Sequence, residues 1–262
     1  MAASPVAERV TRWRGAALGV CLALACGPLA AQNRITLQQL GLRKGPDYAA
    51  TLAGQRVIVR GVVSTPAFHF AEYTTLAIQD GRNGGVLKVA RPDSSLDRYH
   101  PGDELEAEGT VVMLYGMTAV APDKVTLLGR KAAPDPRDLT PRELQSPLHL
   151  GELVRTQGTV QEAPRHNGGG AVILLPGQQD LYKLFIPRAP GAPKANVESI
   201  HKGDTVRVTG VALQYCPTPP YNASYEMLVA DVGDIVVGVR RVVEVDTDEA
   251  GDGETVSPPP SR

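Results

Sequence analysis

Aromatic side chains in the loops between predicted strands, with basic side chains near them, are the residues of this sequence best suited to bind a ligand. Aromatic faces stack on planar rings, and lysine or arginine pairs with anionic groups beside them. The candidate contacts are Phe68, Phe70, Tyr73, Tyr115, Arg82, Lys88, Arg165, Lys183, Tyr215, Tyr221 and Tyr225. The pattern predicts noncovalent binding of a base, a sugar ring or another planar group. The same rings could instead fold back and plug the ends of the fold.

Patterns for metal binding are weak. None of the five histidines stands at a spacing that places two metal ligands on one element beside a cysteine or carboxylate. His69 and Glu72 come nearest, and we interpret them as part of a surface loop. We therefore expect no metal and no cofactor.

Catalytic patterns are equally weak. Asp103 and Asp204 each follow a glycine, which is typical of aspartates that stabilise a turn by accepting backbone N–H groups. The glycine clusters at 81–85 and 168–170 lack the spacing and the following helix of a phosphate-binding loop. The sequence has no Gly-x-Ser-x-Gly motif and no plausible Ser-His-Asp set. We therefore expect a protein that is not an enzyme.

The first 31 residues have the pattern of an export signal. Three arginines precede a short apolar run over 16–25, and Leu29-Ala30-Ala31 offers small residues for cleavage after Ala31. Lipid attachment at Cys26 is the disfavoured alternative, because Ala23 stands where a lipoprotein motif prefers leucine. No later segment approaches the roughly 20 apolar residues of a membrane span. We expect a periplasmic or secreted protein.

The net charge bears on the class of partner that we expect, and the cysteine content bears on disulfide formation. The chain has 27 Lys+Arg and 28 Asp+Glu, and removal of 1–31 takes the formal net charge from −1 to −3. Proteins that bind nucleic acid neutralise its phosphates with a basic surface, so the negative net charge of this chain disfavours a nucleic-acid partner. Cys216 would be the one cysteine after cleavage, which excludes an intramolecular disulfide.

The remaining sequence contains an internal repeat. Segment 54–63 aligns with 151–160 at a spacing of 97, and segment 100–109 aligns with 201–210 at a spacing of 101. Each copy is preceded by a capping-box pattern, at 36–40 and at 140–144. The repeat predicts two domains, 32–131 and 132–239, followed by an acidic, proline-rich tail over 240–262 that we expect to be disordered.

In each copy, the residue pattern of the sequence predicts five strands. The expected strands are 57–62, 76–80, 86–91, 105–111 and 124–128 in the first copy and 153–160, 171–175, 182–187, 205–213 and 227–237 in the second. Gly61, Gly109, Gly158 and Gly210 fall inside strands, where glycine permits the sharp bend of a small barrel. We predict an all-β fold of two tandem five-stranded OB-fold Greek-key barrels, each preceded by a short helix.

Several motifs resemble those of a known group of proteins. The matching segments are Val59–Val63, Ile78–Gly81, Pro101–Gly109 and Val208–Gly210. They resemble the tandem OB-fold repeats of exported bacterial proteins, including the extracytoplasmic input modules of some sensor histidine kinases. No kinase region follows in this sequence, so the resemblance implies a stand-alone relative or a module that signals through another chain.

Two functions from different classes remain open at this point. The first is an exported, non-enzymatic module, sensory in one version, that binds a small ligand, a saccharide or an envelope protein. The alternative is a single-stranded nucleic-acid-binding protein or an accessory domain of a secreted nuclease, which predicts binding that weakens steeply with salt. A third reading, a purely structural adaptor, predicts that Phe70 and Tyr221 can be replaced without loss of function.

Overall fold

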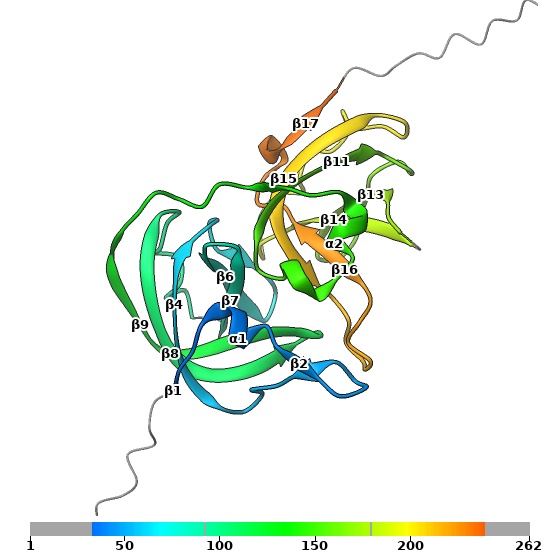
Figure 1. Cartoon of the computed structure of the whole chain (residues 1–262). Helices are drawn as coiled ribbons and strands as arrows, with labels where there is room; N and C mark the ends of the chain where they lie inside the picture. The colour runs from blue at the N-terminus through cyan, green and yellow to red at the C-terminus, as the bar shows by residue number, and fades with distance from the viewer. Residues whose placement is uncertain (1–32, 92, 179, 239–262) are drawn as a thin grey trace, which may run out of the picture. The chain divides into compact units, whose positions relative to one another are not determined.

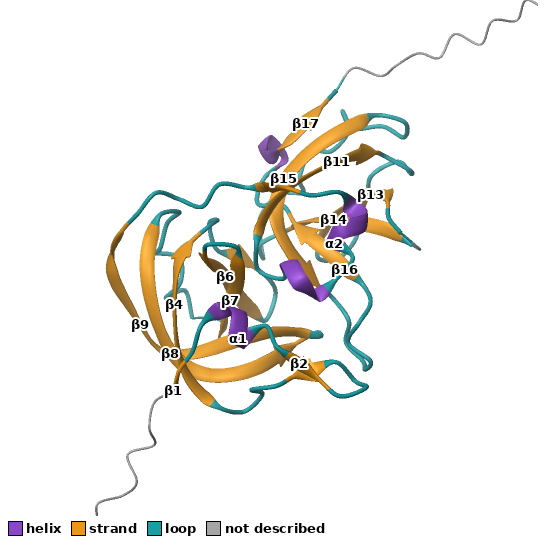
Figure 2. Cartoon of the chain, viewed as in Figure 1, coloured by secondary structure: helices purple, strands orange, loops and turns teal. Residues whose placement is uncertain are grey.

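The computed structural model describes residues 33–91, 93–178 and 180–238, and these belong to one compact unit. The predicted export segment 1–31 and the predicted tail 240–262 lie outside the described residues. The described chain is built mainly of strands, with short helical turns between them (Figures 1 and 2). None of its helices is long and apolar enough to cross a membrane.

The first barrel has five main strands. They are β4 (Arg56–Val63), β6 (Tyr73–Asp80), β7 (Asn83–Ala90), β8 (Asp103–Leu114) and β9 (Met117–Arg130). The pairing order is β4-β6-β7-β9-β8 and back to β4, with only β7 and β9 parallel. This closed order defines an OB-fold and confirms the predicted fold class.

The second barrel repeats this order. Its strands are β11 (Leu153–Thr159), β13 (Gly170–Pro176), β14 (Leu181–Pro187), β15 (Thr205–Gln214) and β16 (Tyr225–Leu228). Strands β14 and β16 are parallel, as β7 and β9 are in the first barrel. Within the described residues no ladder joins β11 to β13, and the Gln161 N–H bonds across this seam to the Leu174 carbonyl at 2.9 Å.

Shorter elements extend both barrels. They are β1 (Asn33–Arg34), β2 (Arg43–Lys44), β3 (Ala49–Ala50), β5 (Phe68–His69), β10 (Arg137–Asp138), η1 (Pro147–His149), β12 (Arg165–His166), η2 (Val232–Asp234) and β17 (Ile235–Val237). Strand β1 runs parallel to β4, and β10 runs parallel to β11, so the repeat includes the segment that enters each barrel. Strand β17 adds to β15 in the second barrel.

A capped helical turn opens each copy, as predicted. In α1 (Leu37–Leu40) the Gln39 N–H donates to Thr36 Oγ1 at 3.1 Å, and the Gln39 side chain accepts from the Thr36 N–H at 2.9 Å. Thr140 and Glu143 make the same reciprocal bonds at α2 (Pro141–Leu144). The caps satisfy N–H groups that a helix start leaves free. Both leucines of α1 are buried in the first core, and Leu144 is buried in the second.

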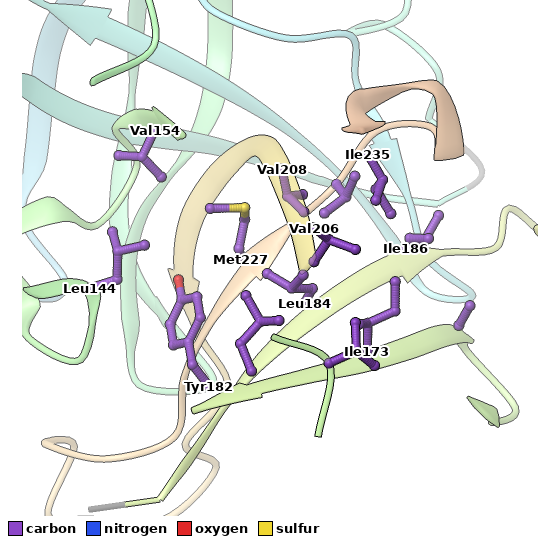
Figure 3. Close-up of a cluster of buried hydrophobic side chains, with 14 of the residues drawn as sticks. Leu144, Val154, Ile173, Tyr182, Leu184, Ile186, Val206, Val208, Met227 and Ile235 are labelled. Atoms are coloured by element: carbon purple, nitrogen blue, oxygen red, sulfur yellow. The ribbon is translucent and has the colours of Figure 1, made fainter. Parts of the chain in front are cut away.

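Each barrel encloses its own apolar core. In the second core Tyr182, Leu184 and Met227 converge with side chains of β13 and β15 (Figure 3). The mid-strand glycines allow the strands to approach closely, as predicted. A Cβ at Gly109 would lie 2.1 Å from the Ala121 carbonyl oxygen, and one at Gly210 would lie 2.3 Å from that of Leu228. Only glycine fits at these two bends.

The repeated Gly-Asp turns are structural. The Asp103 carboxylate accepts the His100 N–H at 2.9 Å, and the Asp204 carboxylate accepts the His201 N–H at 2.7 Å. Gly102 and Gly203 occupy the left-handed region at φ 93° and 89°. The prediction of turn-stabilising aspartates is therefore confirmed.

Both predicted fifth strands have the wrong bounds. Strand β9 starts at Met117, earlier than predicted. Pro122 lies within this strand and is tolerated because it is opposite Gly109, at a register shift where the ladder is interrupted. Strand β16 ends at Leu228 rather than continuing through Val237. Asp231 caps η2 by accepting the Gly233 N–H at 2.8 Å, which turns the chain before β17.

Candidate functional site

The two barrels meet through an apolar cluster and several backbone contacts. The cluster contains Phe68, Ala77, Val86, Met117 and Ala119 from the first barrel and Leu153, Val211, Leu213 and Leu228 from the second. The Leu153 N–H donates to Gln79 Oε1 at 2.9 Å, and the Cys216 N–H donates to the Tyr115 carbonyl at 2.7 Å. The barrels thus share a packed and hydrogen-bonded interface.

A cavity of about 570 Å³ lies beside this cluster. Its lining is Phe70, Ala71, Glu72, Tyr73, Thr75, Leu114, Tyr115, Met117, Asn167, Gly168, Gly169, Lys183, Phe185, Leu213, Gln214, Tyr215, Glu226 and Leu228. The first barrel contributes the loop between β4 and β6 and the turn between β8 and β9. These correspond to the loops that frame the binding face of an OB-fold. The second barrel contributes residues of β14, β15 and β16 together with residues 167–169 and Tyr215, so both barrels build one site.

A row of aromatic rings runs along the cavity. The ring centroids of Phe70 and Tyr73 are 4.6 Å apart, those of Tyr73 and Tyr115 are 6.2 Å apart, and those of Tyr115 and Tyr215 are 4.8 Å apart. These separations are typical of attractive offset or tilted pairs. Because Tyr215 belongs to the second barrel, the row crosses the interface and offers a continuous aromatic wall.

Tyr115 occupies a costly backbone conformation. Its φ is 48° and that of Gly116 is 86°, so both central residues of the turn between β8 and β9 are left-handed. Such turns suit asparagine followed by glycine, and a bulky residue at the first position is strained. The Cys216 N–H and the Arg43 guanidinium bond to the carbonyls of Tyr115 and Gly116 and hold the turn. Strain of this kind is concentrated at functional sites.

One charged pair, a buried carboxylate with a partly exposed lysine, lies in the cavity wall. Lys183 forms an ion pair with Glu226, and its Nζ lies 5.4 Å from the ring centroid of Tyr215 and 5.5 Å from that of Phe185. Burial raises the pKa of Glu226, and the lysine opposes that rise. Burial also raises the pKa of Tyr73, so its hydroxyl stays protonated at neutral pH. The wall is therefore mainly aromatic, with one mutually neutralised charge pair and the exposed carboxylate of Glu72.

The structure brings together part of the predicted binding set. Phe70, Tyr73, Tyr115, Lys183 and Tyr215 all line the cavity. Lys88 lies beside it, with its Nζ 6.0 Å from the ring centroid of Tyr73.

The other predicted contacts lie elsewhere. Phe68 is buried in the cluster between the barrels, because its strand β5 pairs with β6, and Tyr225 is buried in the second core. Tyr221 lies outside the cavity lining, and its N–H donates to the Asp47 carbonyl at 2.8 Å. Arg82 is exposed in the turn between β6 and β7, and Arg165 is exposed and paired with Glu162 at 2.9 Å.

Sequence reasoning missed Thr75, Phe185, Gln214 and Glu226. Strand alternation could have found two of them, since residues two apart share a face. Thr75 lies two residues after Tyr73 on β6, and Phe185 lies two residues after Lys183 on β14. Among the described residues no group of three or more His, Cys, Asp or Glu could hold a metal ion.

The strand order and the shared cavity define a tandem OB-fold protein with one composite aromatic pocket. No family model and no curated protein matches the sequence. Among solved structures, the chain is similar to a murine DNA-binding protein bound to double-stranded DNA, at TM-score 0.32 and 10% identity over 70% of this chain and 97% of that one. It is also similar to the single-stranded DNA-binding protein of Thermus aquaticus, at TM-score 0.24 and 13% identity over 72% and 95%.

A third similarity is to asparaginyl-tRNA synthetase from Pyrococcus horikoshii, at TM-score 0.29 and 19% identity over 37% of this chain and 23% of that one. The match to a Leishmania major aspartyl-tRNA synthetase likewise covers only 22% of that chain. At TM-scores this low the similarities carry no argument, and the fold assignment rests on the strand order itself.

Proposed function

We propose that this chain is an exported, non-enzymatic binding protein that takes the planar ring of one small molecule into the cavity shared by its barrels. The observation that carries the proposal is the aromatic row from Phe70 to Tyr215 along a cavity of about 570 Å³. Pockets for small molecules measure roughly 300–1,000 Å³ and combine apolar walls with a few polar groups. Export rests on the predicted signal segment at 1–31.

The chemistry of the lining favours binding over catalysis. Partly exposed Lys183 and buried Glu226 neutralise one another in the wall, and the third charged residue of the lining, Glu72, is exposed. A general base or nucleophile would need to be free to act on a substrate. The strained turn at Tyr115 gives further support, since the strain places an aromatic ring in the site.

A single-stranded nucleic acid is the second candidate. The observation that favours it is the location of the cavity at the loops that OB-folds use to stack bases, with Lys88 and Lys183 beside the rings. In that case a base of the strand would enter the cavity while its backbone crossed the surface. Such binding would weaken steeply as salt is raised.

A thermal-shift panel tests the proposal. Purified protein is heated with nucleosides, single-stranded oligonucleotides, aromatic amino acids and small saccharides, because a ligand of the folded state raises the Tm. We expect a small molecule with a planar ring to raise the Tm. Tyr115→Asn, which suits the turn but removes the ring, should weaken binding at least about tenfold, in line with the loss of one stacking contact. Tyr221→Ala is the matched control, and its affinity should stay within about twofold, since the residue lies outside the cavity lining.

Three results would count against the proposal. One is a strongest ligand without a planar ring, and another is full affinity in Tyr115→Asn. The third is binding confined to oligonucleotides with a steep salt dependence, which would establish the second candidate instead.

A further inference from the structure

Three buried polar atoms of residues that line the cavity have no hydrogen-bond partner among the described residues, and one of them, Glu226 Oε2, is engaged in the ion pair with Lys183. The other two are Thr75 Oγ1, on β6 of the first barrel, and Gln214 Oε1, at the end of β15 of the second. The two residues are 2% and 3% exposed. Buried polar groups are nearly always paired, and an unpaired one costs free energy. Two such atoms in one cavity therefore point to a ligand that satisfies them.

The Gln214 side chain is held so that its oxygen remains available. Its Nε2 donates to the Ala223 carbonyl at 2.8 Å, which fixes the amide and leaves Oε1 as a pure acceptor. The Thr75 hydroxyl can donate or accept. A ligand that pairs both atoms must carry on one edge an N–H or O–H donor for Gln214 and a polar group for Thr75.

We propose that Thr75 and Gln214 are the hydrogen-bonding end of the site and that its ligand is a nucleobase, free as a nucleoside or carried by a strand. This inference rests on the proposed function, because the aromatic row is taken to stack the ring. A nucleobase is planar and carries donors and acceptors on one edge. A plain aromatic ring would leave both atoms unpaired, which a hydrogen-bonding site disfavours strongly.

The distribution of polar groups separates a base from a sugar. A saccharide carries hydroxyls around its whole rim, whereas this lining is mostly aromatic and aliphatic, with its unpaired atoms at Thr75 and Gln214. Lys183 and the buried Glu226 are paired with each other, so the ring itself need carry no charge. A neutral ring with a polar edge fits this arrangement.

Titration calorimetry with adenosine, guanosine, cytidine and uridine tests the inference, with toluene as a planar ring that has no hydrogen-bonding group. Thr75→Val removes the hydroxyl at nearly constant shape and should weaken nucleoside binding at least about tenfold. Thr156→Val is the matched control, since Thr156 is also a buried threonine with an unpaired Oγ1 but lies outside the cavity lining. Its affinity should stay within about twofold. Gln214→Met should behave as Thr75→Val does, and if it fails to fold, Thr75→Val alone decides.

The outcomes separate this inference from the proposed function. If Tyr115→Asn abolishes binding but Thr75→Val does not, the ring stacks without edge recognition, and the inference falls while the proposed function stands. Failure of all nucleosides and of a single-stranded oligonucleotide to bind also overturns it, whatever else binds. If nothing planar binds, both fall. Nucleoside binding that an oligonucleotide cannot displace supports a free ligand, and tighter, salt-dependent oligonucleotide binding supports a base within a strand.

Discussion

The two barrels share one strand order but close it by different means. In the first, β4 pairs directly with β6 through Val62 opposite Gln79 and Val63 opposite Ile78. In the second, the described residues show only the bond from the Gln161 N–H to Leu174 across the corresponding seam. An OB barrel can therefore be completed by a backbone ladder in one copy and chiefly by packing of the core in another.

The outer surfaces differ as well. The first barrel carries ion pairs across its strands, with Glu104 bound to Arg60 at 2.8 Å and to Lys131 at 2.7 Å. The second barrel has one ion pair, between Lys183 and the buried Glu226, in the cavity wall. The same fold has thus placed charges on solvent-facing strands in one copy and beside the site in the other.

A single repeat position illustrates this divergence. Val86 and Lys183 are 97 residues apart, the spacing of the first aligned block, and each precedes a fully buried leucine. Val86 packs in the cluster between the barrels, whereas Lys183 lines the cavity. The first copy uses this strand face to hold the barrels together, and the second uses it to build the site.

The largest effect should come from the matched core leucines. Leu87 and Leu184 are each 0% exposed, and each packs in the core of its own barrel. Leu87→Ala should lower the free energy of unfolding by about 4 kcal/mol and Leu184→Ala by about 3 kcal/mol, because a barrel without the closing ladder can relax further into the space. Urea unfolding measures both. An equal or larger loss for Leu184→Ala would contradict this account of closure.

A smaller effect is expected where the two backbones touch. A Cβ at Gly84 would lie 2.0 Å from the Gly151 carbonyl carbon, so Gly84→Ala must push the barrels apart at this point. We expect a loss of about 2 kcal/mol, typical of overpacking, in urea unfolding. A parallel loss of ligand affinity should follow, because the cavity has a wall from each barrel.

Gly129→Ala is the control for this contact, since a Cβ there meets nothing within 4 Å. Its stability should stay close to that of the natural protein. Unchanged stability and affinity in Gly84→Ala would show that the barrels are free to shift without consequence for the site.

Much of the fold was predictable because local rules and the repeat agreed. The capping boxes at Thr36 and Thr140, the Gly-Asp turns and the bends at Gly109 and Gly210 all reflect short-range chemistry that appears twice. The predicted end of the second fifth strand was wrong because the cap at Asp231 starts the turn η2, after which Ile235–Val237 form the separate strand β17.

The site was only partly predictable. Loop aromatics such as Phe70, Tyr115 and Tyr215 could be picked out from their residue type and position relative to the barrel strands. Their meeting in one cavity depends on how one barrel packs on the other, which no local pattern encodes. Strand alternation places Thr75 on the same face as Tyr73, but nothing in the sequence shows that the side chain of Thr75 or of Gln214 will be buried without a partner.

The smallest expected effects are opposite pH dependences in the two barrels. Arg60 and Lys131 lower the pKa of Glu104 from its ordinary 4.5 to about 2, so its contribution to stability is present above 4.5 and is lost as the pH falls towards 2. Burial raises the pKa of Glu226, so the folded state holds a proton there more tightly than the unfolded chain. Stability from Glu226 therefore falls as the pH rises from its ordinary pKa through the raised one.

Urea unfolding is measured between about pH 2 and pH 7 for the natural protein, Glu104→Gln and Glu226→Gln. The comparison separates the contribution of Glu104 to the pH dependence of stability from that of Glu226. Glu104→Gln should weaken the loss of stability on acidification. Glu226→Gln should weaken the decline on the alkaline side of the ordinary glutamate pKa, although it also leaves Lys183 without its partner. If both variants change the pH dependence in the same direction, the charges of the two barrels do not have the separate roles assigned to them. Opposite changes would place the acid-sensitive ion pairs on the surface of the first barrel and the buried carboxylate in the wall of the site.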